Sequence, residues 1–415
     1  MAKEIRISLL GHKDHGKSTL IGRILHDTGS ISADRVNEAR AVCASMKKEF
    51  EFAFLLDSFV EEREGGFTLD TTVAQARRGD FIFDLVDVPG HKELVRNMLS
   101  GASLADAAIL IVSAKEDEGL QDETRLHIYL ARMLGIEKIV VAVNKMDTAG
   151  YGRERFEVLR EEILGVLVSL GFDRARAEFV PVSARAGDNI MERSDAMPWY
   201  AGEPLIRHME GFASGAGRLA SLPPRMFVQD VYPVQGRTLV VGKIESGSFS
   251  EGEGIVVGPR MLKARIVEML GSGGKRVRSA SAGQNVGLTL SESGGVARGD
   301  LCTPEGRPVR PSRMIRARIF CLPEGALEPG ERFTITCASQ ERGARILRVL
   351  SRFNPAIERE PVSVQGAGRV GPCEAAEAEL EAEGEVLMEK FSEVPPTGRF
   401  IISKKGRIAA VGVVI

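Results

Sequence analysis

The chain has 415 residues, more than the roughly 100–200 of an ordinary domain, so we expect two to four domains and exclude a single small module. Hydrophobic residues make up 43% and charged residues 27%, as in globular proteins. No apolar run approaches the roughly 18 residues of a membrane-spanning helix, and the formal net charge is only −2.

The charge changes sign along the chain. Residues 1–210 carry 27 Lys and Arg against 35 Asp and Glu, a balance of −8, whereas the remainder carries 28 against 22, a balance of +6. An asymmetry of this kind can mark a nucleic-acid-binding face. Because +6 spread over two domains is modest, we favour a different solvated surface on each domain, and with the motifs described below the split fits two surfaces for protein partners.

The N-terminus and the cysteines bear on the compartment. The first residues, Met-Ala-Lys-Glu-Ile-Arg, contain no apolar signal core. The cysteines are odd in number, scattered and free of Cys-x-x-Cys spacing, which is typical of a reducing compartment rather than of a disulfide or zinc framework. We therefore expect a cytoplasmic protein with thiols at Cys43, Cys302, Cys321, Cys337 and Cys373.

Strand and helix patterns alternate through the first half of the chain. Alternating apolar residues at 5–9 run into Gly11, and helical spacing follows at 20–25. Further short apolar runs have the character of buried parallel strands, and two later segments have helical spacing, the second closed by Gly171. Alternation of this kind predicts a doubly wound α/β domain. The predicted strands are 81–88, 107–112, 139–143 and 179–182, and the two later helices are 126–134 and 156–170.

The pattern changes after a linker rich in small residues and proline at 213–224. Short β-rich runs separated by turn residues follow, and a second proline-rich breaker at 303–311 divides them. We therefore predict a multidomain α/β plus β chain: a P-loop domain with a mostly parallel sheet, followed by two β-barrels. The expected boundaries are 1–212, 225–303 and 312–415.

A P-loop pattern follows the first predicted strand. Residues 11–18 match G-x-x-x-x-G-K-[ST] between a strand and a helix, as the motif requires. Backbone N–H groups of such a loop hold the α- and β-phosphates of a nucleotide. The lysine neutralises β- and γ-phosphate oxygens, and the serine hydroxyl is a Mg²⁺ ligand. The predicted nucleotide-binding residues are Gly11, His12, Lys13, Asp14, His15, Gly16, Lys17, Ser18 and Thr19, with Lys17 also catalytic.

Three further strand ends carry matching motifs. Asp87-Val-Pro-Gly90 places a carboxylate for Mg²⁺ and a flexible glycine near the γ-phosphate. In Asn144-Lys145-Met146-Asp147 the last carboxylate can accept hydrogen bonds from guanine N1–H and the 2-amino group, which adenine lacks. This pattern selects GTP over ATP. A weaker segment, Ser183-Ala184-Arg185, is placed for backbone contacts to the guanine oxygen.

Together these motifs resemble those of the GTPases of the translation-factor class. The loop at 12–19, the segment Asp87-Val-Pro-Gly-His91 and the segment at 144–147 are jointly specific for that class. Both β-rich stretches are similar to the barrels of elongation factor 1 alpha, so the resemblance spans essentially the whole chain. It implies GTP or GDP and Mg²⁺ as ligands, and a monovalent cation near Asp14 as a further one.

The resemblance also implies roles for residues of the two switches. Thr68 corresponds to the threonine that closes over Mg²⁺ and the γ-phosphate, with Ser18 and Asp87 as the other metal ligands. His91 corresponds to the residue that positions the attacking water and is the second expected catalytic residue. Gly90 would pivot in response to the γ-phosphate.

The chain departs from the family pattern around the catalytic histidine. The first switch normally contains Arg-Gly-Ile-Thr, whereas this chain has Gly65-Gly66-Phe67-Thr68, and Lys13 replaces a valine of the P-loop. In the family that valine and that isoleucine form an apolar gate beside the histidine. We therefore expect intact GTP binding with slow or differently gated intrinsic hydrolysis.

Three functions fit this resemblance. The stretches 18–25, 51–57 and 187–200 look closest to the GTPase subunit of heteromeric sulfate adenylyltransferase, the ATP sulfurylase. That likeness implies a regulatory subunit coupling GTP hydrolysis to sulfate adenylylation on a separate catalytic subunit. The alternative is a factor like elongation factor 1 alpha or EF-Tu that delivers aminoacyl-tRNA to the ribosome, and a third possibility is a GTP-dependent scaffold with little catalysis.

Two charged runs bear on the choice between these partners. Alternate glutamates from Glu377 to Glu385 predict five carboxylates on one strand face, which favours solvation over an acidic docking face and weighs mildly against tRNA. The arginines that straddle the second linker have no interleaved aromatics, so surface charge is favoured over RNA contact. These arginines are Arg307, Arg310, Arg313, Arg316 and Arg318.

Overall fold

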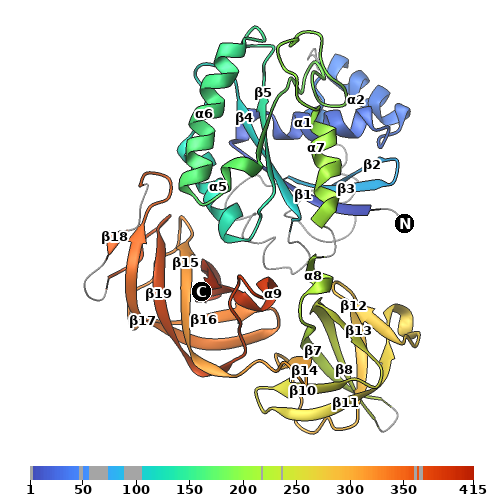
Figure 1. Cartoon of the computed structure of the whole chain (residues 1–415), viewed down its shortest axis with the longest axis vertical. Helices are drawn as coiled ribbons and strands as arrows, with labels where there is room; N and C mark the ends of the chain where they lie inside the picture. The colour runs from blue at the N-terminus through green and yellow to red at the C-terminus, as the bar shows by residue number, and fades with distance from the viewer. Residues whose placement is uncertain are drawn as a thin grey trace. The chain divides into compact units, whose positions relative to one another are not determined.

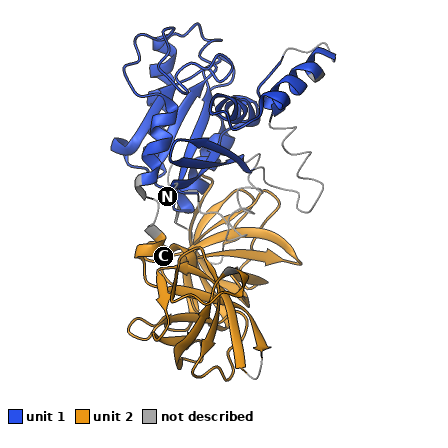
Figure 2. Cartoon of the chain, turned by 90° about the vertical axis from the view of Figure 1, so that its right-hand side faces the viewer, with its two compact units in different colours: residues 1–216 blue, residues 217–415 orange. Residues whose placement is uncertain are grey.

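The computed structural model divides the chain into two units, residues 1–216 and 217–415, which differ in secondary structure (Figure 2). The first unit mixes helices and strands, and the second is almost entirely β (Figure 1). The structure describes residues 3–45, 50–55, 73–87, 105–215, 218–234, 237–358, 362–363 and 368–415.

A six-stranded sheet forms the centre of the first unit, in the order β2-β3-β1-β4-β5-β6. Neighbouring strands from β3 to β6 are parallel, and β2 alone pairs antiparallel, at the edge. Every residue of β4 and β5 is buried, as expected for central strands covered on both faces. The predicted doubly wound sheet is thus confirmed. The strands are β1 (Lys3–Leu10), β2 (Val73–Arg78), β3 (Phe81–Asp87), β4 (Ala107–Ser113), β5 (Ile139–Asn144) and β6 (Ala177–Pro181).

Helices cover both faces of this sheet (Figure 1). Apolar residues of α1 and α7 share one buried cluster with alternate residues of β1, β3, β4 and β5, and α5 and α6 lie on the opposite side. The helices are α1 (Lys17–Asp27), α2 (Ala33–Ser45), α5 (Asp122–Met133), α6 (Arg153–Ser169) and α7 (Leu205–Gly211). Short 3-10 turns occupy η1 (Lys13–His15), η2 (Arg174–Arg176) and η3 (Phe212–Gly215).

The helix α6 ends as its sequence predicts. Gly171 adopts a φ of +89°, the left-handed conformation that glycine reaches without a steric penalty. Its N–H bonds to the carbonyl of Val168, and the N–H of Phe172 bonds to the carbonyl of Leu167. These two bonds form a Schellman cap, which satisfies carbonyls that the helix leaves open.

The second unit begins with a closed barrel of strand order β10-β11-β13-β8-β7-β14. Its interior holds apolar residues from every wall, among them Val228, Val240 and Ile266. The strands are β7 (Arg225–Val234), β8 (Arg237–Ser246), β10 (Gly254–Gly258), β11 (Leu262–Leu270), β13 (Asn285–Leu290) and β14 (Leu301–Pro304). A small sheet of β9 (Ser248–Ser250) and β12 (Ser279–Ser281), the short helix α8 (Arg218–Ser221) and the turn η4 (Ser272–Gly274) accompany it.

A second antiparallel sheet, of order β16-β20-β21-β15-β19-β17-β18, follows in the same unit. An additional pairing of β16 with β17 closes six of its strands into a ring. The predicted fold, an α/β domain followed by two barrels, is therefore confirmed. The elements are β15 (Ser312–Cys321), β16 (Arg332–Cys337), β17 (Gln340–Phe353), β18 (Val362–Ser363), β19 (Ala375–Val386), α9 (Pro395–Gly398), β20 (Arg399–Lys404) and β21 (Arg407–Val414).

A buried ion pair joins the two barrels. Arg225 of β7 is 1% exposed and donates from Nε and Nη2 to the two carboxylate oxygens of Glu389, each at 2.7 Å. Thr397 of α9 donates to the same carboxylate at 2.8 Å. Nearby, the Ser339 hydroxyl donates to the carbonyl of Val228 across the same junction. The barrels therefore share polar contacts, and Phe227 and Leu301 of the first barrel belong to the apolar cluster of the second.

The glutamates of β19 form a ladder of ion pairs with arginines of the neighbouring strands. Four of the five predicted carboxylates have such a partner, so this strand presents neither an acidic docking face nor a merely solvated one. Cross-strand pairing across β15, β17 and β16 neutralises them, which sequence alternation within β19 alone does not reveal. The pairs are Arg316–Glu377, Arg348–Glu379, Arg345–Glu381 and Arg332–Glu383.

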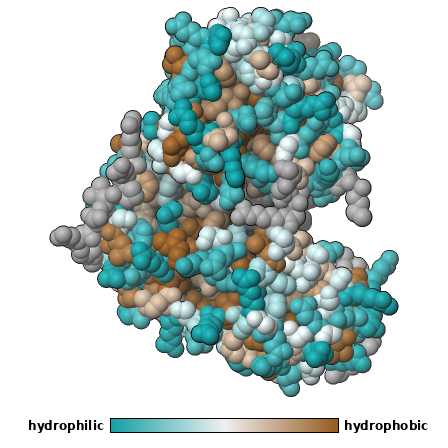
Figure 3. Space-filling view, in the orientation of Figure 1, coloured by the Kyte–Doolittle hydropathy of each residue, from teal (hydrophilic) through white to brown (hydrophobic). Residues whose placement is uncertain are grey.

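Hydrophilic residues cover most of the face that Figure 3 shows. Within the described ranges, no helix has the length and apolar character needed to cross a membrane. All five cysteines are free thiols, and four of them are buried.

Candidate nucleotide-binding site

The P-loop connects the end of β1 to the start of α1 and is shaped by two glycines. Gly11 and Gly16 have φ values of +135° and +88°, and both lie against other strands of the sheet. A Cβ on Gly11 would stand 2.3 Å from the carbonyl oxygen of Ile111, and one on Gly16 would stand 2.5 Å from Nδ2 of Asn144. The loop therefore tolerates no side chain at either position.

Lys17 lies inside the loop that it is expected to serve. Its Nζ donates to the carbonyl oxygens of Gly11 at 2.8 Å and His12 at 3.0 Å, and the residue is 4% exposed. Burial lowers the pKa of the Lys17 ammonium, and the nearby carboxylate of Asp87 opposes that shift. A nucleotide phosphate would replace neutral carbonyl oxygens with charged acceptors for the same donor.

The two histidines of the P-loop have different surroundings. His15 is fully buried, and its Nδ1 lies 3.1 Å from the carbonyl oxygen of Ile111. Burial lowers the pKa of His15 to about 4, so its ring is neutral at pH 7. His12 is half-buried, and its Nε2 lies 3.4 Å from Glu123. The His15 ring thus packs inside the loop, and the carbonyl oxygen of His15 accepts a hydrogen bond from Asn144 Nδ2 at 2.9 Å.

The remaining loop residues face outward or begin the helix. Lys13 and Asp14 are exposed, and Thr19 and Ser18 are half-buried in the first turn of α1. The exposed position of Lys13 agrees with a solvent-facing lysine. Its side chain has no ion pair or hydrogen bond within the described part of the chain.

Two of the three predicted metal ligands lie together. The Ser18 hydroxyl donates to Oδ2 of Asp87 at 3.4 Å, where the end of β3 meets the start of α1. A serine hydroxyl beside a carboxylate supplies the hard oxygen ligands that Mg²⁺ prefers. The described residues therefore fit a Mg²⁺ ion held jointly with nucleotide phosphates. Thr68, the third predicted ligand, lies outside the described residues.

The guanine-recognition motifs meet in one hydrogen-bonded network. Asn144 Oδ1 accepts from the N–H of Ala184 at 2.9 Å, so this side chain ties the loop after β6 to the P-loop. Ser183 Oγ donates to Oδ1 of Asp147 at 2.8 Å and thereby orients that carboxylate. Met146 is fully buried, and its N–H bonds to the carbonyl of Val182. The structure thus brings the predicted guanine residues together.

Glu118 is a member of this site that the sequence did not predict. Lys145 has a positive φ of +62°, and its Nζ lies 2.6 Å from Oε2 of Glu118. Burial opposes ionisation of Glu118, but hydrogen bonds from Lys145 and Ser113 lower its pKa to about 2. The sequence signal that could have identified Glu118 is its place in the loop after β4, because ligands of such sheets bind at the carboxyl edge of the strands.

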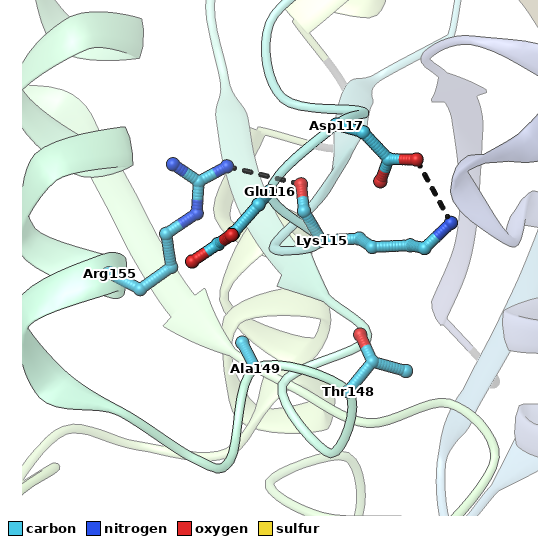
Figure 4. Close-up of a pocket in the computed structure, with 6 residues that line it drawn as sticks. All are labelled: Lys115, Glu116, Asp117, Thr148, Ala149 and Arg155. Atoms are coloured by element: carbon cyan, nitrogen blue, oxygen red, sulfur yellow. Dashed lines mark hydrogen bonds and ion pairs between the residues drawn. The ribbon is translucent and has the colours of Figure 1, made fainter.

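A hollow of about 480 Å³ is lined in part by Thr148 and Ala149, which directly follow the guanine motif in sequence (Figure 4). Lys115 bonds to Asp117 at 3.3 Å, and the Arg155 guanidinium donates to the carbonyl of Lys115 at 3.1 Å. None of the predicted nucleotide residues lines this hollow, so we place the nucleotide in the P-loop network instead. Its lining residues are Lys115, Glu116, Asp117, Thr148, Ala149 and Arg155.

The switch residues form the part of the predicted site that the structure leaves open. His91, Gly90 and Thr68 lie outside the described residues, as does the altered stretch 65–67. Arg185 is described, and its carbonyl oxygen accepts from Arg23 of α1 at 3.2 Å. The described site is therefore the phosphate loop, two metal ligands and the guanine network.

Comparison with known proteins identifies relatives along the whole chain. Residues 2–218 match the family described as the elongation factor Tu GTP binding domain, and residues 314–415 match the family described as the GTP-eEF1A C-terminal domain-like. Elongation factor 1-alpha of Pyrobaculum aerophilum is 33% identical over 99% of this chain and 94% of its own length. Elongation factor 1-alpha of Methanothermobacter thermautotrophicus is 32% identical over 100% of this chain and 98% of its own length.

A solved structure shares the fold at low sequence identity. The GTPase-like domain of Ski7 from S. cerevisiae, bound to GTP, has a TM-score of 0.58 and 17% identity, covering 100% of this chain and 97% of its own. These relatives carry the name of an elongation factor or a GTPase-like protein. The match to the elongation factor Tu GTP binding domain and the elongation factor 1-alpha relatives support the GTPase prediction, and they give no support to the predicted sulfate adenylyltransferase role.

Proposed function

The chain belongs to the elongation factor Tu family of GTP-binding translation factors, and we propose that it is a carrier of aminoacyl-tRNA of the elongation factor 1-alpha type. The family implies GTP or GDP and Mg²⁺ as ligands and GTP hydrolysis as the activity. The observation that carries the proposal is collinearity: the 32–33% identity extends over the GTPase domain and both barrels. A protein that kept only the GTPase domain would not match over the barrels.

The described residues supply most of what GTP binding requires. Lys17 would bind the β- and γ-phosphates, Asp147 would accept the guanine donors, and Ser18 with Asp87 would hold Mg²⁺. When bound, Mg²⁺ neutralises charge on the phosphates. We further propose His91 as the residue that positions water, Thr68 as the third metal ligand and Gly90 as the pivot. A monovalent cation near the exposed Asp14 remains part of the proposal.

The charges of the second barrel favour the tRNA carrier more than the sequence indicated. The acidic strand that weighed against RNA is neutralised, because the glutamates of β19 pair with arginines. Several exposed arginines near the second linker have no ion pair in the ranges that the structure describes, which leaves cations for a polyanionic partner. These arginines are Arg307, Arg310, Arg313 and Arg318.

The regulatory subunit of an ATP sulfurylase remains the second candidate. It rests on the sequence stretches 18–25, 51–57 and 187–200. We also propose cytoplasmic location and the domain boundaries 1–212, 225–303 and 312–415 for either function. The altered switch leaves the scaffold with little catalysis as a third outcome.

The nucleotide state of the protein should control its binding of aminoacyl-tRNA. We expect the form loaded with a non-hydrolysable GTP analogue to protect the ester bond of aminoacyl-tRNA from spontaneous hydrolysis. The GDP form should protect it at least tenfold less, because the family couples domain arrangement to the γ-phosphate. Ester decay is followed at equal protein concentrations.

A parallel purification from the native cell separates the alternatives. Recovery of tRNA supports the carrier. Recovery of an adenylyltransferase-like protein, together with GTP-dependent formation of adenylyl sulfate and no ester protection, would replace the carrier by the sulfurylase subunit. Absence of both partners with slow GTP hydrolysis would favour the scaffold.

Lys13 provides a test of the altered gate. The Lys13→Val variant restores the family residue on an exposed side chain, so GDP affinity should stay within about twofold of the parent. Partner-stimulated GTP turnover, measured as phosphate release with saturating partner, should change severalfold. An unchanged and normal stimulated rate contradicts a role for Lys13 in gating.

A further inference from the structure

Arg23 of α1 contacts two other segments of the first unit and one residue of its own helix. Its Nη1 donates to the carbonyl oxygen of Arg185 at 3.2 Å, in the turn at residues 183–187 that we call the guanine loop. Its Nε donates to Oδ2 of Asp27 at 2.6 Å, one helical turn further along α1. Its guanidinium lies over the ring of Phe52, 4.9 Å from the ring centroid. The side chain is only 19% exposed, so it is held rather than solvated.

The guanine loop is held on the nucleotide side by hydrogen bonds within the predicted site. Asn144 accepts from the N–H of Ala184, and the Ser183 hydroxyl accepts from the N–H of Ala186 at 3.1 Å. The N–H of Gly187 bonds to the carbonyl of Ser183 at 2.7 Å and closes the turn. These bonds set the shape of the turn, and Ala184 is the residue whose backbone faces the network.

A polar hollow borders the guanine loop. This hollow has a volume of about 430 Å³ and is lined mostly by polar and charged side chains, among them Arg23, Asp27 and Arg193, and also by Gly187. Gly187 has a φ of +93°, and a Cβ on it would stand 2.1 Å from Nη2 of Arg23. The guanidinium is therefore packed directly against the loop backbone at Gly187.

Phe52 and Asp27 fix the orientation of the guanidinium. The segment at 50–55 lies directly on α1, because a Cβ on Gly22 would stand 1.9 Å from the carbonyl oxygen of Phe52. The Phe52 ring also meets the ring of His26 edge-on at 5.3 Å. Leu55 of the same segment is fully buried, which anchors it in the core. Arg23 is thus preorganised by partners that do not touch the guanine loop.

We propose that Arg23 is a positioning residue for guanine-nucleotide binding, and that Phe52 acts on the nucleotide only through Arg23. This inference rests on the proposed guanine site. Arg23 restrains the Arg185 carbonyl and so limits the movement of the adjacent Ala184 backbone, which Asn144 holds within the guanine network. Stacking on an aromatic ring while donating in two directions needs a planar guanidinium, which lysine lacks.

The test is a double-mutant cycle on the full chain, followed by release of fluorescently labelled GDP. Arg23→Gln should speed GDP dissociation roughly tenfold, because a charged hydrogen bond to the loop is lost. Phe52→Leu should speed it roughly threefold. The double variant should be no faster than Arg23→Gln alone, because the ring acts through the guanidinium.

Matched controls separate positioning from general stability. Arg160→Gln removes an arginine that pairs with Glu157 on the surface of α6, and its dissociation rate should match the parent. The nucleotide-free Arg23→Gln protein should unfold within a few degrees of the parent, and Arg23→Lys should recover only part of the slow dissociation.

Three results would overturn the inference: an unchanged GDP dissociation rate in Arg23→Gln, full recovery with lysine, or additive effects of the two substitutions. A parent protein that binds no GDP would instead overturn the proposed function. The parent measurement therefore distinguishes the two failures.

Discussion

An Asp147→Asn variant is expected to lose roughly a thousandfold of its affinity for GTP and to gain measurable affinity for xanthosine triphosphate. Two hydrogen bonds from guanine to a carboxylate are each worth about 1.5–3 kcal/mol, and every 1.4 kcal/mol is a factor of ten. The structure shows this carboxylate half-buried and oriented by Ser183 Oγ at 2.8 Å. Asparagine keeps the shape but presents an amide donor, which suits the 2-oxo group of xanthine.

Equilibrium titration with labelled GTP, ATP and xanthosine triphosphate measures this change. Asp173→Asn is the control, because that aspartate is exposed, caps the short turn η2 and pairs with Arg176 of the same turn. Its nucleotide affinities should equal those of the parent. Equal affinity of the unmodified protein for ATP and GTP would refute guanine recognition by Asp147, whatever the variant does.

An Arg225→Ala variant is expected to destabilise the second unit by about 3–5 kcal/mol, because it leaves the Glu389 carboxylate buried between the barrels without its cationic partner. That carboxylate is only 14% exposed and accepts two bonds from Arg225 at 2.7 Å. For a unit of this size the loss corresponds to roughly 10 °C in melting temperature. Hydrogen exchange of the β7 and β19 amides, together with thermal unfolding of the full chain, measures it.

Arg345→Ala provides the matched control on the same unit. Arg345 also bonds to a glutamate, Glu381, at 2.7 Å, but the two side chains are 57% and 36% exposed. Solvent screening limits such pairs to about 0–1 kcal/mol. The double variant Arg225→Met with Glu389→Leu should recover most of the stability. An Arg225→Ala protein as stable as Arg345→Ala would show that burial of the pair is irrelevant.

Short-range patterns predicted much of the fold of the first unit. The strands β1, β3, β4 and β5 and the helices α1, α5 and α6 were predicted because buried runs and helical spacing are properties of contiguous residues. The helix α2 and the strand β2 were not predicted. Most residues of α2 are polar, and β2 alternates small and polar residues. Such segments are stabilised by the neighbours they pack against, here the antiparallel edge beside β3.

The local sequence by itself determined the phosphate loop and the guanine motif, because both chemistries depend on residues at fixed short spacings. Only the tertiary structure decided which distant groups complete them. Glu118 pairs with Lys145 from another strand end, and Arg23 reaches the guanine loop across 162 positions of sequence. The glutamates of β19 likewise form ion pairs with arginines of neighbouring strands. Strand order and register decide which charged side chains pair. The residue pattern along a single segment does not contain that information.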